Sequence, residues 1–148
     1  MEIKVLVVDD EIDFLETIVK RLEKKGLHTV GVTSGEDALI KIKEKYYDVI
    51  LLDIKMPGGM DGLDALKEIK SRQPLAEVIL LTGHGTVESS VEGMRLGAFD
   101  YVLKPAKFEE LCEKIAQAYM KKSDQDNKIR KANIQQLLRF PGRVFDQE

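Results

Sequence analysis

Short runs of β-branched and aliphatic residues alternate with stretches of helical periodicity from residue 3 to residue 120, and this alternation constrains the fold more than any other feature. It is typical of parallel β-α-β units, in which a helix connects each strand to the next. Right-handed connections of this kind produce a sheet that is covered on both faces. The sequence therefore predicts an α/β fold with a doubly wound, five-stranded parallel sheet, whose strands are expected at residues 3–8, 28–32, 49–52, 78–81 and 99–103.

The segments that follow these strands carry apolar residues three or four positions apart, which predicts five helices. Gly26 is expected to end the first helix as its C-cap, and Ser34 to begin the second as its N-cap. The apolar faces are predicted from Phe14, Leu15, Ile18, Val19 and Leu22 in the first helix, Ala38, Leu39 and Ile42 in the second, Leu63, Leu66 and Ile69 in the third, Val87, Val91 and Met94 in the fourth, and Phe108, Leu111, Cys112, Ile115 and Tyr119 in the fifth.

Residues 1–122 are predicted to form one domain and residues 123–148 a C-terminal extension. The polar stretch 123–127 predicts a break after the fifth helix. The extension contains neither a phosphate-binding loop motif nor a clear helix-turn-helix, so no output domain is recognised. A short further helix is expected before Pro141, with its apolar side formed by Ile129, Ala132, Leu137 and Leu138.

The composition excludes several classes of protein. The longest apolar runs have four residues, far below the roughly 18 needed to cross a membrane, and the N-terminus has no secretory signal pattern. The single cysteine, Cys112, excludes an internal disulfide framework and favours the reducing cytoplasm. The net charge of -3 divides into -6 on residues 1–120 and +3 on residues 121–148. An acidic body argues against nucleic acid as a direct partner.

Five polar residues stand directly after predicted strands: Asp9 and Asp10 after the first, Asp53 after the third, Thr82 after the fourth and Lys104 after the fifth. Taken singly, such residues are common in helix caps, turns and solvated loops. In a doubly wound sheet, however, the carboxyl ends of the strands border the crevice in which ligands bind. The sequence therefore predicts that these five side chains meet at one site.

Three carboxylates at one site repel each other and need a compensating charge, which we expect a divalent cation to supply. Mg²⁺ prefers one or two carboxylates, water and a phosphoryl oxygen, so Asp10 and Asp53 are expected to bind it directly and Asp9 through water. A carboxylate beside such an ion can attack phosphorus, which makes Asp53 the candidate phosphoryl acceptor. Lys104 would then neutralise one phosphoryl oxygen, and the Thr82 hydroxyl would donate a hydrogen bond to another.

Several short motifs surround these positions, and together they indicate a family. They are Val7-Val8-Asp9-Asp10-Glu11, Asp53-Ile54-Lys55-Met56-Pro57, Met60-Asp61-Gly62, Thr82-Gly83-His84-Gly85 and Gly97-Ala98-Phe99-Asp100-Tyr101-Val102-Leu103-Lys104-Pro105. With them, the chain resembles the receiver domains of two-component response regulators over roughly residues 3 to 120, and this resemblance implies a flavodoxin-like fold. The motif that begins at Thr82 is most similar to receivers attached to ATPase-type transcriptional activators.

The resemblance implies that a sensor histidine kinase or a phosphotransfer protein donates a phosphoryl group to Asp53, and that Asp9 and Asp10 bind Mg²⁺. Thr82 and Tyr101 would form a switch pair that remodels the surface of the fourth helix, the fifth strand and the fifth helix. A partner or, as a homodimer, a second copy of the chain would bind that surface. Apart from phosphotransfer to itself and autodephosphorylation at Asp53, no enzymatic activity is expected.

Further expectations concern the rim of the pocket. The resemblance implies that the backbone carbonyl of Lys55 is another Mg²⁺ ligand and that the Lys104-Pro105 peptide bond is cis. The side chains of Lys55 and His84 are expected to flank the mouth of the pocket, where each would either tune dephosphorylation or be a solvated loop residue. The chain departs from the family at Gly58-Gly59, where one residue is usual, so that the loop after the acceptor is one residue longer.

Three other functions fit parts of the pattern. A phosphatase of the haloacid-dehalogenase type would need an acid two residues beyond its aspartate nucleophile, where this chain has Lys55. The chain would alternatively be the regulatory fragment of a longer DNA-binding transcriptional activator, or a binding module that signals without phosphorylation. The complete set of five pocket residues favours a phosphorylated receiver over the last of these.

Overall fold

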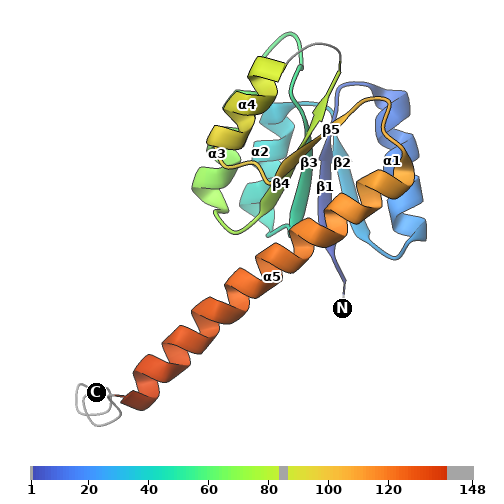
Figure 1. The fold of residues 1–148 in the computed structure, drawn as a ribbon. Coiled ribbons are helices and arrows are strands. Elements are labelled where there is room, and N and C mark those ends of the chain that lie inside the picture. Colours follow the sequence, from blue (N-terminus) through green and yellow to red (C-terminus); the bar gives the residue numbers. More distant parts are fainter. Residues whose placement is uncertain (1, 84–86, 140–148) are drawn as a thin grey trace.

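The computed structural model describes residues 2–83 and 87–139 and has a five-stranded parallel sheet at its centre (Figure 1). The strands lie in the order β2-β1-β3-β4-β5, so the chain moves first to one side of β1 and then to the other. The predicted doubly wound α/β fold is therefore confirmed. The strands are β1 (Lys4–Val8), β2 (His28–Val32), β3 (Val49–Asp53), β4 (Glu77–Thr82) and β5 (Asp100–Leu103).

Helices cover both faces of the sheet (Figure 1). They are α1 (Ile12–Lys24), α2 (Gly35–Glu44), α3 (Gly62–Arg72), α4 (Val87–Arg95) and α5 (Phe108–Arg139). α1 and α5 pack on one face, whereas α2, α3 and α4 pack on the other. Among the described parts of the chain, no helix combines the length and the apolar character needed to span a bilayer.

Strand β3 shows why the central strands are apolar throughout. Ile50 and Leu52 join the core beneath α2 and α3, whereas Val49 and Leu51 join the core beneath α1 and α5. Successive side chains of a strand point to opposite faces, so a strand that is covered on both sides needs apolar residues at every position. All four side chains are fully buried.

The two helix caps predicted from the sequence, Ser34 and Gly26, agree with the structure to within one residue. The Ser34 hydroxyl accepts a hydrogen bond from the Asp37 N–H at 3.1 Å and so caps α2. Gly26 lies one residue beyond Lys25, the C-cap of α1. Its φ of +89° falls in the left-handed region, which glycine enters without steric cost, and the chain turns there into β2.

The predicted apolar face of α4 does not face the core. Val91 and Met94 are 46% and 40% exposed, while the buried positions of this helix are Ser90 and Gly93. A Cβ on Gly93 would overlap a leucine side chain of β4, so only a residue without a side chain lets α4 pack this closely on the sheet. The side chain of Val87, the third predicted member of the face, is outside the described part of the structure.

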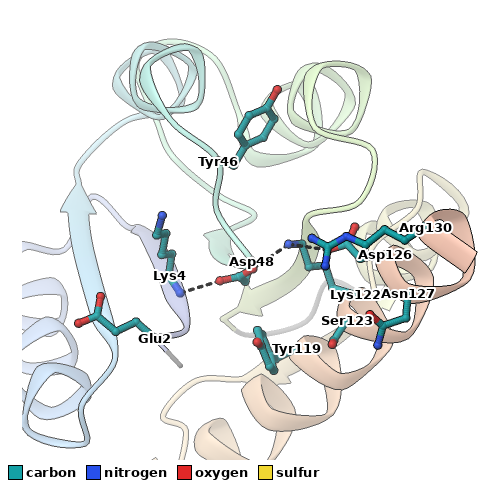
Figure 2. A pocket seen from close by; sticks show the side chains of 10 residues that line it. All are labelled: Glu2, Lys4, Tyr46, Asp48, Tyr119, Lys122, Ser123, Asp126, Asn127 and Arg130. Carbon is teal, nitrogen blue, oxygen red and sulfur yellow. Dashed lines mark hydrogen bonds and ion pairs between the residues drawn. The ribbon is translucent and has the colours of Figure 1, made fainter. Parts of the chain in front are cut away.

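The predicted break at residues 123–127 and the separate short helix expected after it are wrong, because α5 continues without interruption to Arg139 (Figure 1). The stretch is polar, but it contains neither proline nor glycine and can therefore continue a helix. Ser123, Asp126 and Asn127 border a hollow together with Lys4 and Asp48, and polar side chains suit this position (Figure 2). An ion pair between Lys122 Nζ and Asp126 at 3.0 Å, one helical turn apart, adds to this continuity.

At the end of the sheet opposite the predicted site, charged side chains tie α5 to the strands (Figure 2). Asp48, just before β3, accepts a hydrogen bond from the Lys4 N–H at 2.8 Å and pairs with Lys122 Nζ at 2.9 Å. Lys121 pairs with Glu77 at the start of β4, at 3.3 Å. The first of these contacts borders a hollow of about 400 Å³, and together they hold α5 where it leaves the sheet.

Candidate functional site

The carboxyl ends of four strands form the predicted site. Asp9 directly follows β1, Asp53 ends β3, Thr82 ends β4, and Lys104 directly follows β5. Since β1, β3 and β4 are parallel neighbours, their carboxyl ends lie side by side. The chain reverses its direction of winding between β1 and β3, and doubly wound sheets bind their ligands at such a position.

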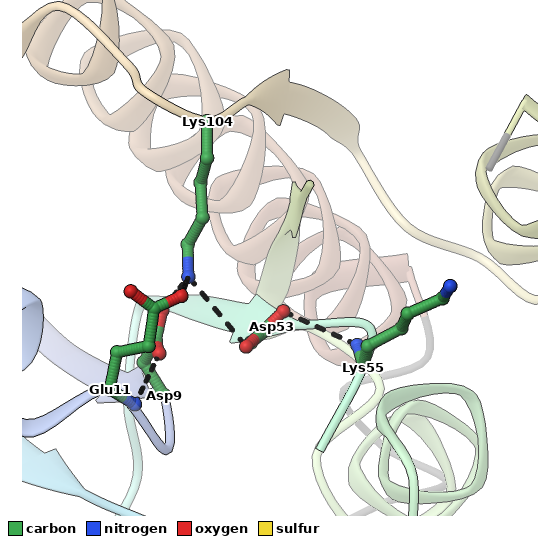
Figure 3. A network of polar contacts seen from close by, with 5 residues as sticks. All are labelled: Asp9, Glu11, Asp53, Lys55 and Lys104. Atoms are coloured by element: carbon green, nitrogen blue, oxygen red, sulfur yellow. Dashed lines mark hydrogen bonds and ion pairs between the residues drawn. The ribbon is translucent and has the colours of Figure 1, made fainter. Parts of the chain in front are cut away.

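Three carboxylates meet in this crevice. Oxygen atoms of Asp9, Asp10 and Asp53 all lie within 4.8 Å of one another. Asp9 and Asp53 are buried and Asp10 is exposed, so the cluster opens to solvent on one side. Backbone N–H groups orient the buried pair: Glu11 donates to Asp9 Oδ1 at 2.8 Å, and Lys55 donates to Asp53 Oδ1 at 3.3 Å (Figure 3). The predicted acidic cluster is thus present.

Lys104 brings positive charge to the cluster. Its Nζ lies 2.6 Å from Asp9 Oδ2 and 3.7 Å from Asp53 Oδ2 (Figure 3). The ammonium group also lies 4.6 Å from the centre of the Phe14 ring, within the range of a cation–π contact. The peptide bond between Lys104 and Pro105 is cis, as the resemblance implied. Lys104 is therefore held within reach of both buried carboxylates.

One lysine does not balance the charge of this cluster. Burial raises the pKa of Asp53 to about 7, and the charge of Asp9 adds to the rise while Lys104 opposes it. Burial also raises the pKa of Asp9. A second cation would therefore stabilise the ionised site. The available ligand atoms are carboxylate oxygens, which suit a small, hard ion such as Mg²⁺.

Thr82 and Tyr101 lie on the adjacent strands β4 and β5. Thr82 is 1% exposed, and its hydroxyl has no hydrogen-bond partner among the described residues. A buried hydroxyl without a partner is unfavourable, so an acceptor that entered the crevice beside it would gain a donor. Tyr101 is 42% exposed, which places its ring at the surface of β5.

Lys55 takes part in the site through its backbone. Its N–H donates to Asp53, while its side chain is exposed and extends away from that carboxylate (Figure 3). His84, the other residue predicted to tune dephosphorylation, lies outside the described residues. A tuning role for either side chain stays a prediction.

Two residues of the site were not singled out from the sequence. Glu11 Oε1 accepts a hydrogen bond from Lys104 Nζ at 3.1 Å, and only its place directly after the aspartate pair pointed to it. Gly62 donates its N–H to the Ile54 carbonyl at 2.8 Å and packs directly against the backbone of Asp53. In the sequence, Gly62 was indicated only as part of the Met60-Asp61-Gly62 motif, and the sequence did not reveal its physical role.

Gly62→Ala is expected to lower the free energy of unfolding by about 2 to 3 kcal/mol. The added methyl group would overlap backbone atoms of Asp53 and Ile54, which cannot yield without a shift of the end of β3. Urea unfolding followed by circular dichroism measures the loss. Gly83→Ala is the control, because its methyl group would meet no described atom within 4 Å. Equal losses in the two variants would contradict the prediction.

Comparisons with known proteins agree with this geometry. A model of the response regulator receiver domain family matches residues 5–116. Transcriptional regulatory protein ZraR of Salmonella typhimurium is 37% identical over 117 residues, which are 79% of this chain and 26% of ZraR. Regulatory protein AtoC of Escherichia coli is 41% identical over 108 residues, which are 73% of this chain and 23% of AtoC. The chain thus spans about a quarter of the length of these relatives.

Solved structures show the same fold. The receiver domain of NtrX from Brucella abortus is 34% identical, with a TM-score of 0.75, and the match covers 78% of this chain and 98% of that domain. A longer NtrX chain in complex with ADP gives a TM-score of 0.82 at 32% identity, over 86% of this chain and 29% of NtrX. The flavodoxin-like fold that the resemblance implied is therefore confirmed. This chain belongs to the response regulator receiver domain family.

Proposed function

We propose that this chain is a phosphorylation-activated signalling receiver. A sensor histidine kinase or a phosphotransfer protein donates a phosphoryl group to Asp53, and the surface formed by α4, β5 and α5 changes as a result. The observation that carries the proposal is the position of Asp53, whose carboxylate lies with those of Asp9 and Asp10 beside the Lys104 ammonium. The proposed location is the cytoplasm, where the single free cysteine stays reduced.

The transfer forms one bond and breaks another. An oxygen of ionised Asp53 attacks phosphorus and forms an O–P bond, while the P–N bond to the donor histidine breaks and its electron pair returns to the imidazole nitrogen. Lys104, with Nζ 3.7 Å from Asp53 Oδ2, neutralises charge on the transferred oxygens. Asp9, Asp10, Asp53 and the Lys55 carbonyl would hold Mg²⁺, which when bound neutralises further charge. The chain then acts only on itself, through phosphoryl uptake and autodephosphorylation.

The buried Thr82 hydroxyl is proposed to carry the change to the surface. Its oxygen, which has no partner among the described residues, donates a hydrogen bond to the phosphoryl group, and the Tyr101 ring turns inward from its exposed position. The surface that changes includes exposed apolar side chains, which are Val91 and Met94 on α4 and Leu103 on β5. An exposed apolar patch of this kind suits a protein partner or a second copy of the chain.

Incubation with acetyl phosphate and Mg²⁺, followed by measurement of the intact mass, tests the proposal. The wild type is expected to gain one phosphoryl group on Asp53. A folded wild type that gained none would refute the proposed function. Comparison of the elution volume with and without beryllofluoride, which imitates the phosphoryl group, then shows whether the activated chain binds a second copy.

Thr82→Val is expected to raise the free energy of unfolding by about 1 kcal/mol, because it removes a buried hydroxyl that has no partner among the described residues. Phosphoryl uptake is expected to continue, since Asp53 and Lys104 are unchanged. The response of α4 and β5 to beryllofluoride, measured from backbone amide shifts, is expected to disappear. Thr82→Ser keeps the hydroxyl and serves as the control. A full response in Thr82→Val would show that the hydroxyl carries no signal.

A second proposed function is that of the regulatory part of a longer DNA-binding transcriptional activator. The chain spans about a quarter of its relatives ZraR and AtoC, which are named as regulatory proteins. In addition, α5 extends past the sheet as a continuous helix (Figure 1). Residues 1–122 would then be the receiver domain and residues 123–148 its connection. A reading frame that continues beyond residue 148 into another domain would support this function, and a stop codon at that point would refute it.

A further inference from the structure

The loop between β3 and α3 contains two adjacent glycines, Gly58 and Gly59. Gly58 has a φ of +85°, in the left-handed region. Glycine loses more conformational freedom on folding than any other residue, so a loop with two of them needs contacts that hold it. This loop begins directly after Asp53 and includes Lys55, whose carbonyl is a proposed Mg²⁺ ligand.

Glu36, in the first turn of α2, supplies such a contact. Its Oε2 accepts a hydrogen bond from the Met60 N–H at 3.1 Å. Hydrogen bonds from its own N–H and from that of Met60 hold the pKa of Glu36 below its usual range. The carboxylate also lies against Gly59, where an added Cβ would be 2.7 Å from Glu36 Oε2. Because Gly59 has no side chain, the Glu36 carboxylate can occupy the space beside it.

Other contacts fix the remainder of the loop. A Cβ on Gly35 would lie 3.2 Å from Met60 Sδ, so the Met60 side chain packs directly on the start of α2. Two residues further on, the Gly62 N–H donates to the Ile54 carbonyl at 2.8 Å, which returns the chain to the end of β3. The loop is therefore held by α2 at Gly59 and Met60, shortly before α3 begins, and by β3 at its two ends.

We infer that Glu36 is a positioning residue for the metal-binding loop, which by holding Met60 keeps the Lys55 carbonyl directed at the carboxylate cluster and so raises the affinity for Mg²⁺. The inference rests on the proposed function, because it assumes a Mg²⁺ site formed by Asp10, Asp53 and that carbonyl. Glu36 acts through the loop and contacts neither the metal nor the phosphoryl group. Release of Met60 would let the loop adopt more conformations, of which few present the carbonyl to the site.

Titration with MgCl2, followed through the backbone amide shifts of Asp53 and Lys55, measures metal affinity without any phosphoryl transfer. Glu36→Ala is expected to raise the dissociation constant about threefold, as the loss of one exposed hydrogen bond would. Glu36→Gln keeps an oxygen that accepts from the Met60 N–H and is expected to bind Mg²⁺ like the wild type. If Glu36→Gln weakened binding as much as Glu36→Ala, the charge alone would explain the effect and the inference would be wrong.

Two further variants separate the contact from the helix that carries it. Glu44→Ala removes the same charge from the other end of α2, where Glu44 pairs with Lys41 at 3.8 Å, and is expected to leave the affinity unchanged. Gly59→Ala pushes the Glu36 carboxylate aside and is expected to weaken binding by itself. In the Glu36→Ala background, Gly59→Ala should cause no further loss of Mg²⁺ affinity, because the contact between residues 36 and 59 is already lost. Additive losses would overturn the inference.

Phosphoryl uptake from acetyl phosphate distinguishes a failure of the proposed positioning role from a failure of the proposed function. At saturating Mg²⁺, Glu36→Ala is expected to take up phosphoryl at the wild-type rate, and at low Mg²⁺ about threefold more slowly. A wild type that takes up none contradicts the proposed function itself. A wild type that is phosphorylated, alongside variants whose Mg²⁺ affinity is unchanged, contradicts only the positioning role. Thermal unfolding confirms that each variant is folded.

Discussion

Asp53→Asn is expected to abolish phosphoryl uptake from acetyl phosphate in the presence of Mg²⁺, whereas the wild type gains one phosphoryl group. The amide that replaces the carboxylate is not a nucleophile for phosphorus, so no O–P bond forms. Asp9 lies in the same cluster but is fully buried and paired with Lys104 at 2.6 Å, so it is not expected to take over. Intact mass spectrometry of the acid-quenched reaction measures the uptake.

Asp61→Asn is the matched control for this experiment. Asp61 is the N-cap of α3 and accepts a hydrogen bond from the Asp64 N–H at 2.9 Å, a role that asparagine performs equally well. The control therefore makes the same chemical change eight positions along the chain and is expected to be phosphorylated like the wild type. Equal uptake by the wild type and Asp53→Asn would show that the acceptor is a different residue.

The same substitution is expected to stabilise the metal-free protein. Because burial and the charge of Asp9 raise the pKa of Asp53 to about 7, ionisation of Asp53 is unfavourable in the folded state. One pKa unit corresponds to about 1.4 kcal/mol, and the carboxyl has its ordinary pKa of about 4 when the chain is unfolded. Asp53→Asn is therefore expected to raise the free energy of unfolding by up to about 4 kcal/mol at about pH 8 in the presence of a chelator.

The pH dependence of this gain follows from the direction of the shift. Between about pH 4 and pH 7 the folded wild type keeps a proton on Asp53 that the unfolded chain has lost, so rising pH destabilises the wild type over this window. The gain from Asp53→Asn should accordingly be absent below about pH 4, grow up to about pH 7 and stay constant above it. Urea unfolding in chelator at several pH values measures it. A gain that is equal at all pH values would contradict the raised pKa of Asp53 as its cause. The control variant Asp61→Asn should show no gain in the free energy of unfolding.

Much of the site was predictable because its residues stand directly after strands. Asp9, Asp53 and Lys104 each follow or end an apolar run, and the run itself is a local signal of a buried parallel strand. Parallel strands bring their carboxyl ends to one edge of the sheet, so the convergence follows from the fold class without knowledge of any contact. The same reasoning placed Thr82 beside the cluster.

Other features depended on contacts between residues far apart in the chain. The apolar pattern of α4 pointed to Val91 and Met94 as core residues, but the close approach of α4 to β4 selects Gly93 for the buried side and leaves both outside. The pairing of Glu11 with Lys104 likewise joins two elements that are 93 positions apart. A local sequence pattern cannot predict contacts between residues that are so far apart in the chain.

The sequence by itself determined the order of the elements, the class of the sheet and the cluster of carboxylates, because each follows from local periodicity and from which residue ends a strand. Only the tertiary structure decided how the loop after Asp53 is held, that Lys104 is shared between Asp9 and Glu11, and that α5 continues past the sheet. The physical reason is that these outcomes depend on the distances and angles between packed elements, and on charges that neutralise each other across them. A one-dimensional pattern of residue types contains neither these distances and angles nor the positions of the charges.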